Sequence, residues 1–408
     1  MKSSGSTSEQ SRIYNERIIL RLVRQHPDIS RVSIAEQTGL SAQTISVITS
    51  SLLDRQLLHV AGKVKGRRGQ PSIKLSINKQ GAYGLGINVD RDHISAALLN
   101  FSGECVLLVE RAVSFPTENL AKQIASDLIE EVKVTLGDDW SRVQGIGLTR
   151  PDYMDSWLET LVTDQHQLSN LDSLKDALSY WRSDAFEAWL AESTGLVCFC
   201  ENDAVAAATS ELLLAPGILP FDFFYLFVST ACGGSVVANG ECYFGSHGKA
   251  GSFGLIPTAT GKHGKWILEA LSLSSLLRFL GANQLSWPES DGIWQEDAYI
   301  KAVSQWSNEV ACEVASALTA VVALYDPEAI LIGGRLPATV LTSLIGELEK
   351  VVAQQSTLPI PPIRCAQTGQ TAGVLGAAVL PLYEIFAPQK NLLLLSSKDK
   401  QRNTREKP

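Results

Sequence analysis

Short polar side chains near the N-terminus are the first residues whose types and spacing could do chemistry. Ser41, Gln43, Thr44 and Ser46 stand at the start of an expected helix, with Ser41 in the capping position. At the N-terminal end of a recognition helix, such side chains can hydrogen-bond to base edges in the major groove of DNA. We therefore expect these four residues to contact DNA.

A basic loop farther along the chain could hold the same nucleic acid. It lies between strands expected at 57–60 and 73–77, and glycines and a proline flank its adjacent arginines. Glycine lets a backbone approach DNA closely, and arginine suits a narrow, electronegative minor groove. A flexible basic linker is the alternative. The predicted contacts are Lys63 and Lys65 on phosphates, Arg67 and Arg68 in a groove or on phosphates, and Gln70 beside them.

Three helices must position these side chains. Apolar residues recur at helical spacing over 13–23, a second helix fits 32–38, and Gly39 suits a left-handed helix end. Followed by a basic hairpin, this order predicts a winged helix-turn-helix over residues 1–80, whereas an ordinary three-helix bundle is the alternative. The apolar stripe expected on the third helix comprises Ala42, Ile45, Ile48 and Leu52.

Charge is divided unevenly along the 408 residues, whose net charge is -8. Residues 1–80 hold 13 Lys+Arg and 5 Asp+Glu, whereas residues 81–408 hold 22 Lys+Arg and 38 Asp+Glu. A small basic module on a large acidic body favours nucleic-acid binding at one end only. A solvated basic surface is the alternative.

The rest of the chain alternates strands and helices, which indicates an α/β body. No apolar run reaches the roughly 18 residues that span a bilayer, and the N-terminus lacks a signal-peptide pattern. Seven cysteines without framework spacing argue against a secreted disulfide scaffold, so we expect a cytoplasmic protein without a membrane partner. Strands are expected at 85–89, 94–99, 105–109, 143–148 and 329–332, and helices at 121–136 and 310–324.

Four segments give the chain a resemblance to the ROK family of repressors and kinases. They are residues 201–204 (Glu-Asn-Asp-Ala), 244–253, 326–334 and 372–378, and the wing segment 66–71 resembles the xylose- and N-acetylglucosamine-type repressor branch. The resemblance covers about residues 15–382. It implies a winged helix-turn-helix followed by a two-lobed, actin-like, sugar-kinase-like ATPase domain. We place lobe 1 at 81–200, completed by 368–390, lobe 2 at 201–367, and a frayed tail at 391–408.

The phosphate loops of the family's kinases are altered in this chain. Their first loop is Asp-x-Gly-Gly-Thr, whose glycines let backbone N–H groups approach ATP phosphates. The matching stretch begins at Asn88 and carries Asp90, Arg91 and Asp92 in place of the glycines and threonine. Each like-charge pair at ~4 Å costs roughly 1–4 kcal/mol in a partly solvated cleft, so we expect no ATP binding, no kinase activity and no cofactor. In the second loop, serine or alanine replaces the usual glycine at Ser229, Ala231 and Ser235.

The resemblance implies a sugar pocket that is only partly retained. In the family's kinases the Asp of Glu-Asn-Asp takes a proton from the attacking sugar hydroxyl, and the matching residue is Asp203, with Asn202 beside it. Without ATP, Asp203 would accept a hydrogen bond from a sugar, and a turn residue at a strand end is the alternative. The family's Gly-Glu-x-Gly-His motif has lost its Glu and His at residues 251–255. Glu269 could replace a later sugar-binding Glu, and Arg150 could bind an acidic ligand.

Metal binding is not expected. Family members often hold a zinc through one His and a cysteine-rich stretch, but residues 261–266 contain no cysteine. Cys198 and Cys200 stand two apart in an apolar strand, and we interpret them as core residues.

Together these features predict a DNA-binding repressor of carbohydrate-utilisation genes. A homodimer would read a near-palindromic operator in double-stranded DNA. A sugar or sugar derivative in the cleft would favour one lobe closure and so change the spacing of the two winged domains. Two alternatives stay open, namely a carbohydrate kinase with an accessory DNA domain and a regulator switched by a protein partner.

Overall fold

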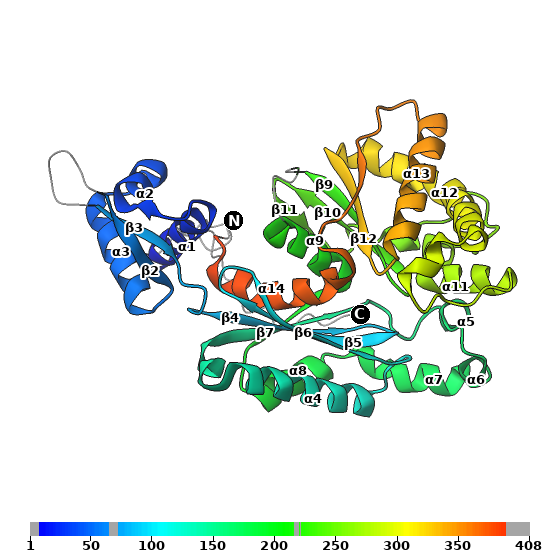
Figure 1. Cartoon of the computed structure of the whole chain (residues 1–408), viewed down its shortest axis with the longest axis horizontal. Coiled ribbons are helices and arrows are strands. Elements are labelled where there is room, and N and C mark those ends of the chain that lie inside the picture. The colour runs from blue at the N-terminus through cyan, green and yellow to red at the C-terminus, as the bar shows by residue number, and fades with distance from the viewer. Residues whose placement is uncertain (1–7, 65–71, 216–219, 221, 389–408) are drawn as a thin grey trace.

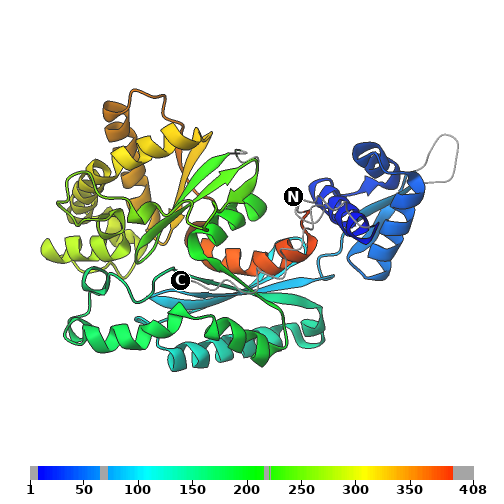
Figure 2. The ribbon, with the colours of Figure 1, turned by 180° about the vertical axis from the view of Figure 1, so that it is seen from behind.

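The computed structural model describes residues 8–64, 72–215, 220 and 222–388, which form a small N-terminal domain and two larger lobes (Figures 1 and 2). In the N-terminal domain, three helices pack on a three-stranded sheet of order β1-β3-β2. The two-residue strand β1 is too short to leave a pattern in the sequence, and it was not predicted. The elements are α1 (Ser8–Gln25), β1 (Ile29–Ser30), α2 (Arg31–Thr38), α3 (Ala42–Asp54), β2 (Leu58–Val64) and β3 (Ser72–Ile77).

Two caps define the turn between α2 and α3, as the sequence predicted. Gly39 ends α2 in the left-handed region at φ 70°, and its N–H donates to the Ala35 carbonyl. Ser41 Oγ accepts the N–H of Thr44 at 3.1 Å and so satisfies one free donor at the start of α3. The turn of a helix-turn-helix is therefore fixed by local hydrogen bonds.

The buried stripe of α3 differs at one position from the expected one. Ile45, Ile48 and Leu52 are buried, but Ala42 is exposed, because it lies in the first turn on the outer side of the helix. The fourth buried position is Thr49, whose hydroxyl donates to the Ile45 carbonyl at 2.7 Å and so leaves no unsatisfied polar atom.

Lobe 1 is a five-stranded sheet of order β6-β5-β4-β7-β8, with α14 on one face and α4 and α8 on the other (Figure 1). Its central strand β4 runs parallel to β7 and antiparallel to β5. The elements are β4 (Tyr83–Val89), β5 (His93–Asn100), β6 (Cys105–Ala112), α4 (Glu118–Leu136), η1 (Gly137–Arg142), β7 (Val143–Arg150), α5 (Leu158–Leu161), α6 (Gln165–Leu168), α7 (Leu171–Leu178), η2 (Ser179–Arg182), α8 (Ala185–Thr194), β8 (Cys198–Asn202) and α14 (Ala372–Phe386).

Lobe 2 is a second five-stranded sheet, of order β11-β10-β9-β12-β13. By length and composition α12 could span a bilayer, but 56% of its apolar window is buried, and it belongs to the core of this lobe. The elements are α9 (Asp203–Leu214), β9 (Phe223–Val228), β10 (Cys232–Ala238), β11 (Glu241–Tyr243), η3 (Phe253–Leu255), α10 (Ile267–Ala270), α11 (Leu273–Ala282), η4 (Asp291–Gln295), α12 (Asp297–Tyr325), β12 (Ala329–Gly334), α13 (Ala338–Gln355), β13 (Ile363–Cys365) and η5 (Gly369–Thr371).

The helix α14 runs from between the two lobes toward the N-terminal domain (Figures 1 and 2). At its far end, Phe386 packs edge-on against Phe101 with ring centroids 4.7 Å apart, within one apolar cluster shared with α1 and α3. Arg24 of α1 donates to the Phe101 carbonyl at 2.9 Å, and Arg17 donates to the Ala387 carbonyl at 3.0 Å. The N-terminal domain is therefore attached to lobe 1 by a continuous core as well as by the chain.

We predict that Gly147→Ala lowers the free energy of unfolding by about 1–3 kcal/mol or more. A Cβ at residue 147 would lie 1.9 Å from the Ala377 carbonyl oxygen of α14, and backbone cannot move aside cheaply. The matched control is Gly346→Ala on α13, where nothing lies within 4 Å and alanine should gain up to about 1 kcal/mol. Denaturant titration of both variants measures the difference, and equal stabilities would contradict the close packing of α14.

Candidate functional site

The outer face of α3 lies at the end of the molecule away from both lobes (Figure 1). Gln43 and Ser46 are exposed on it, whereas the hydroxyls of Ser41 and Thr44 lie 2.8 Å apart and the Ser41 hydroxyl caps the helix. Val47 is 63% exposed on the same face, where its methyl groups could contact a thymine methyl. Val47 is not among the predicted DNA contacts, because the prediction considered only polar side chains.

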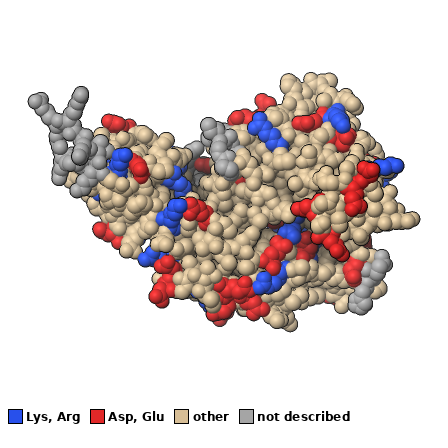
Figure 3. Space-filling view, in the orientation of Figure 1, with Lys and Arg blue, Asp and Glu red and all other residues tan. Residues whose placement is uncertain are grey.

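The predicted wing contacts fall largely outside the described residues. Lys65, Arg67, Arg68 and Gln70 belong to the segment 65–71, and only the backbone of Lys63 is described, in β2. On the face drawn in Figure 3, acidic side chains gather along the lower edge of the body, whereas Lys and Arg on the N-terminal domain alternate with acidic residues. The contacts of the wing thus stay predictions.

The two altered phosphate loops contact each other directly across the cleft. Ser229, after β9 of lobe 2, donates from Oγ to Asp90 Oδ2 of lobe 1 at 2.5 Å, and both side chains are buried. Arg91 is 3% exposed and donates to the Tyr153 carbonyl at 3.1 Å. Side chains thus fill the space where glycine backbones would approach ATP phosphates, and the replacements do more than add negative charge.

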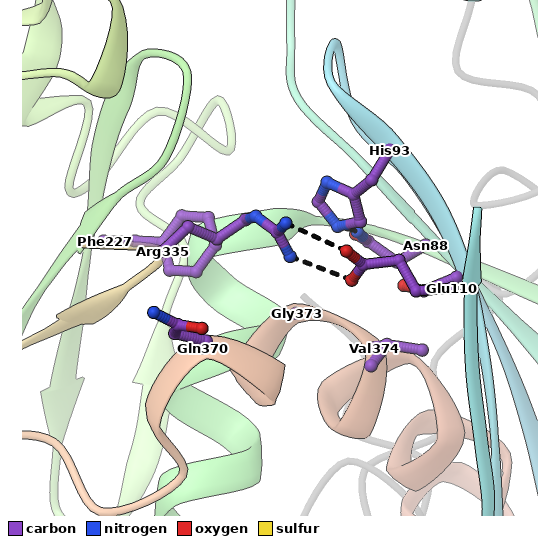
Figure 4. Close-up of a pocket in the computed structure, with 9 residues that line it drawn as sticks. Asn88, His93, Glu110, Phe227, Arg335, Gln370, Gly373 and Val374 are labelled. Carbon is purple, nitrogen blue, oxygen red and sulfur yellow. Dashed lines mark hydrogen bonds and ion pairs between the residues drawn. The ribbon is translucent and has the colours of Figure 1, made fainter. Parts of the chain in front are cut away.

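A second link between the lobes joins Arg335, which follows β12, to Glu110 of β6 (Figure 4). The two terminal nitrogens of Arg335 donate to the two carboxylate oxygens of Glu110 at 2.9 and 3.0 Å. The Nε atom of Arg335 lies 3.6 Å from Asp92 Oδ2. Such bidentate geometry is among the most specific ion-pair arrangements. The cavity left beside this pair has about 10 Å³, room for about one water molecule.

Asp203 lies at the start of α9 beside Asn202, which is the helix cap. Asn202 Oδ1 and Asp203 Oδ1 both accept the N–H of Ala204, at 2.9 and 2.8 Å. Burial, reinforced by the negative charge of Asp90, raises the pKa of Asp203 to about 7. A carboxyl with this pKa is partly protonated at neutral pH and could both donate and accept a hydrogen bond.

The other two predicted effector contacts are engaged elsewhere. Arg150 donates to the Trp181 carbonyl at 2.7 Å, which anchors it to the segment before α8. Glu269 accepts the hydroxyl of Thr160 at 3.0 Å and the N–H of Trp266 at 2.8 Å. It lines a separate cavity of about 420 Å³, and none of Arg150, Asn202 and Asp203 is among the residues lining that cavity. The structure thus places Asn202 and Asp203 together and puts Glu269 in a different pocket.

Among the described residues, one group of side chains lies close enough together to be considered as metal ligands, and its members are bonded to other side chains. Asp90, Asp92 and His93 come within 4.8 Å of one another, but His93 Nδ1 lies 2.6 Å from Asp92, and Asp90 is occupied by Ser229. Cys198 and Cys200 are partly buried against the lobe-1 core, and burial raises the pKa of the Cys200 thiol to about 12. A protonated thiol is a poor metal ligand.

Comparison with known proteins matches both parts of the chain. The ROK family model matches residues 84–383, and a winged helix-turn-helix DNA-binding model matches residues 14–58. The xylose repressor of Bacillus spizizenii is 25% identical over 65% of this chain and 67% of its own. The beta-glucoside kinase of Listeria innocua is 28% identical over 63% of this chain and 86% of its own.

The fold also matches a solved structure. A ROK family transcriptional regulator, described as a homolog of the Escherichia coli MLC protein, superposes with a TM-score of 0.67 at 21% identity. The match covers 92% of this chain and 98% of that one. The expected fold, a winged helix-turn-helix followed by an actin-like two-lobed domain, is confirmed.

We predict that Asp203→Asn changes the pH dependence of stability. Because the folded pKa of this acid is raised, its protonated form stabilises the native state below the unfolded pKa, and this stability is lost as pH rises toward 7. Relative to the wild type, Asp203→Asn should therefore gain in melting temperature between about pH 4 and pH 7. The matched control is Asp127→Asn on the exposed face of α4, which tests whether the change is specific to residue 203. A constant difference for Asp203→Asn would contradict the raised pKa.

Proposed function

Because the chain belongs to the ROK family, we propose that it is a DNA-binding transcriptional repressor of carbohydrate-utilisation genes. The observation that carries this proposal is a winged helix-turn-helix fused to a kinase-like body whose phosphate loops bond to each other. The similarity to a xylose repressor supports the class of regulated genes. We further propose that the protein acts in the cytoplasm, where its operator would be found.

DNA recognition would begin at the outer face of α3. Gln43, Ser46 and Val47 would face base edges in the major groove, and the arginines of the wing would contact a groove or phosphates. A homodimer would present two such domains to the half-sites of a near-palindromic operator. The net positive charge of residues 1–80 would attract the duplex and make binding depend on salt.

Regulation would use the relative position of the lobes. A sugar that binds one lobe arrangement better than another shifts the population toward it. Because the N-terminal domain shares a core with lobe 1 and α14, a movement of lobe 2 in a dimer would change the spacing of the two winged domains. Affinity for the operator would then follow the state of the cleft.

The kinase alternative is supported by similarity to a beta-glucoside kinase but not by the site. Asp90, Arg91 and the Arg335–Glu110 pair occupy the places where a nucleotide would need glycine loops and open space. We therefore propose that the domain is not catalytic and that Asp203 serves as a hydrogen-bonding group.

We predict selective binding to the DNA upstream of the protein's own gene. In a gel-shift titration, Gln43→Ala combined with Ser46→Ala should lower the preference for this DNA over a scrambled duplex by about tenfold or more, because base contacts carry the discrimination. Gln354→Ala, on the exposed face of α13, is the matched control and should bind as the wild type does. Equal affinity of the wild type for both duplexes, with or without sugars, would refute the regulator.

ATP consumption should stay at background with D-xylose, N-acetyl-D-glucosamine or cellobiose as acceptor. The physical reason is that buried Asp90 and Arg91 exclude phosphate from the cleft. A coupled ADP assay measures the turnover. Sugar-dependent turnover that disappears in Asp203→Asn would instead establish a kinase.

A further inference from the structure

One carboxylate at the junction of the lobes is shared between a histidine and an arginine. Asp92, in the loop between β4 and β5, places Oδ1 2.6 Å from Nδ1 of His93 and Oδ2 3.6 Å from Nε of Arg335. His93 begins β5 of lobe 1, and Figure 4 shows its imidazole near the guanidinium of Arg335, which comes from lobe 2. A charge gained by His93 therefore acts directly on the arginine that links the lobes.

The hydrogen bonds around His93 fit a neutral imidazole. Asn88 Nδ2 lies 2.9 Å from His93 Nε2, and Asn88 Oδ1 accepts the hydroxyl of Thr149 at 2.8 Å. Because an amide nitrogen only donates, Nε2 must accept, and the ring proton lies on Nδ1, where it is donated to Asp92. All of Asn88, His93 and Thr149 are buried, so water does not compete for these bonds.

A protonated His93 finds an equally complete set of hydrogen bonds if the Asn88 amide turns over. Nε2–H would then donate to Asn88 Oδ1, and Asn88 Nδ2 would donate to Thr149 Oγ1. The Thr149 hydroxyl would donate in turn to the Gly373 carbonyl, which already lies 3.3 Å away. The cavity of about 10 Å³ lies beside both Asn88 and His93, so the amide is not packed on all sides. The two protonation states thus have two different hydrogen-bond patterns.

The hydrogen-bond pattern reaches the first turn of α14. Gly373 is the second residue of that helix, and a Cβ there would lie 3.3 Å from Asn88 Oδ1. At the other end of α14, Phe386 packs on Phe101 within the core shared with the winged helix-turn-helix domain. The charge of one buried histidine therefore changes the hydrogen bonds at the start of the helix that contacts this domain.

Charged groups of both signs face His93. Those of its own loop are acidic, whereas Arg91 of the same loop donates instead to the Tyr153 carbonyl. The group from lobe 2 is Arg335, which is paired with Glu110 of β6. η5 and α14 contribute no titratable side chain to the lining of the cavity beside His93. The acidic groups are Asp90 and Asp92, and the lining residues of η5 and α14 are Gln370, Gly373 and Val374.

These charges set the direction in which protonation acts. Burial lowers the pKa of His93, but the hydrogen bond to Asp92 and the negative charges of Asp92 and Asp90 outweigh burial and raise the pKa above its ordinary value. Arg335 acts in the opposite direction. Separation of the lobes would remove Arg335 and admit water, and both changes favour the charged ring. Because the separated arrangement would hold the proton more tightly, a falling pH favours it.

We propose that His93 and Asn88 form a proton-controlled relay at the lobe junction. A neutral His93 holds the lobe arrangement of this structure, whereas a protonated His93 weakens the hold of Asp92 on Arg335 and favours separated lobes. His93 and Asn88 are positioning residues, because they act through Asp92, Arg335 and Gly373. The proposal goes beyond the proposed function, since the relay needs neither DNA nor an effector.

The test measures the distance between the lobes of the full chain at different pH values. Two exposed cysteines, Cys105 of β6 and Cys365 of β13, carry spin labels after Cys312→Ser has removed the third. Double electron–electron resonance then records label distances between about pH 8 and pH 6, around the ordinary pKa of histidine. The population with a longer distance should rise at least about threefold as the pH falls, a size that one screened charge interaction can supply. Singly labelled protein identifies distances between two copies of the chain.

Three variants and a control assign the response. His93→Gln should abolish the pH dependence, because glutamine does not titrate. Arg335→Gln should weaken it while His93 stays in place, and this partly exposed side chain can be replaced without opening the core. Asn88→Asp should move the midpoint to higher pH, because a carboxylate beside Nε2 favours the charged ring. The control His247→Gln, on an exposed loop of lobe 2, should keep the profile of the wild type.

The contrary results are equally specific. Label distances in the otherwise unchanged protein that do not depend on pH would overturn the proposal. An unchanged pH profile in His93→Gln would assign the response to another group, and an unchanged midpoint in Asn88→Asp would remove Asn88 from the relay; either result would also overturn it. Failure of the regulator itself would appear separately, as unselective DNA binding in the gel-shift titration.

Discussion

The close packing of α14 on β4 and β7 is the constraint on which the rest of the structure depends. The backbones meet so closely that a Cβ at Gly86 or Gly147 would lie about 2 Å from α14 backbone atoms. One end of α14 borders the cleft, where Gly373 lies beside Asn88, and the other end contacts the N-terminal domain through Phe386. This closely packed helix therefore spans the distance between the junction of the two lobes and the winged helix-turn-helix domain.

The polar contacts across the cleft have a different role. The ion pair between Arg335 and the partly exposed carboxylate of Glu110 contributes roughly 0.2–1 kcal/mol. These polar contacts hold the one lobe arrangement that the structure shows. In the proposed mechanism, an effector would need only a few kcal/mol of differential affinity to shift a balance between two lobe arrangements.

The fold could be predicted from the sequence further than the site could. The helix-turn-helix could be predicted because it depends on local signals, namely Gly39, Ser41 and the spacing of apolar residues in α3. The strands from β4 to β7 could be predicted from their apolar runs. The Arg335–Glu110 ion pair could not be predicted from the sequence, because the two residues lie 225 positions apart. A single charged residue after Gly334 does not indicate which residue it will contact. For the same reason Glu269 could be matched to a family position while its pocket with Trp306 depends on how α10, α11 and α12 pack.

The most direct test of the account is whether fixing the lobes abolishes the response of DNA binding to sugar. Glu110→Cys and Arg335→Cys, joined by a short reducible crosslinker with the exposed Cys105, Cys312 and Cys365 replaced by serine, would tie lobe 1 to lobe 2 beside the cleft. Operator affinity would be measured with and without the sugar that binds. The account predicts that the affinity for the operator is the same with and without sugar while the crosslink is intact. After the crosslink is reduced, the affinity should again depend on the sugar. An unchanged sugar response in the crosslinked protein would contradict control through the lobes.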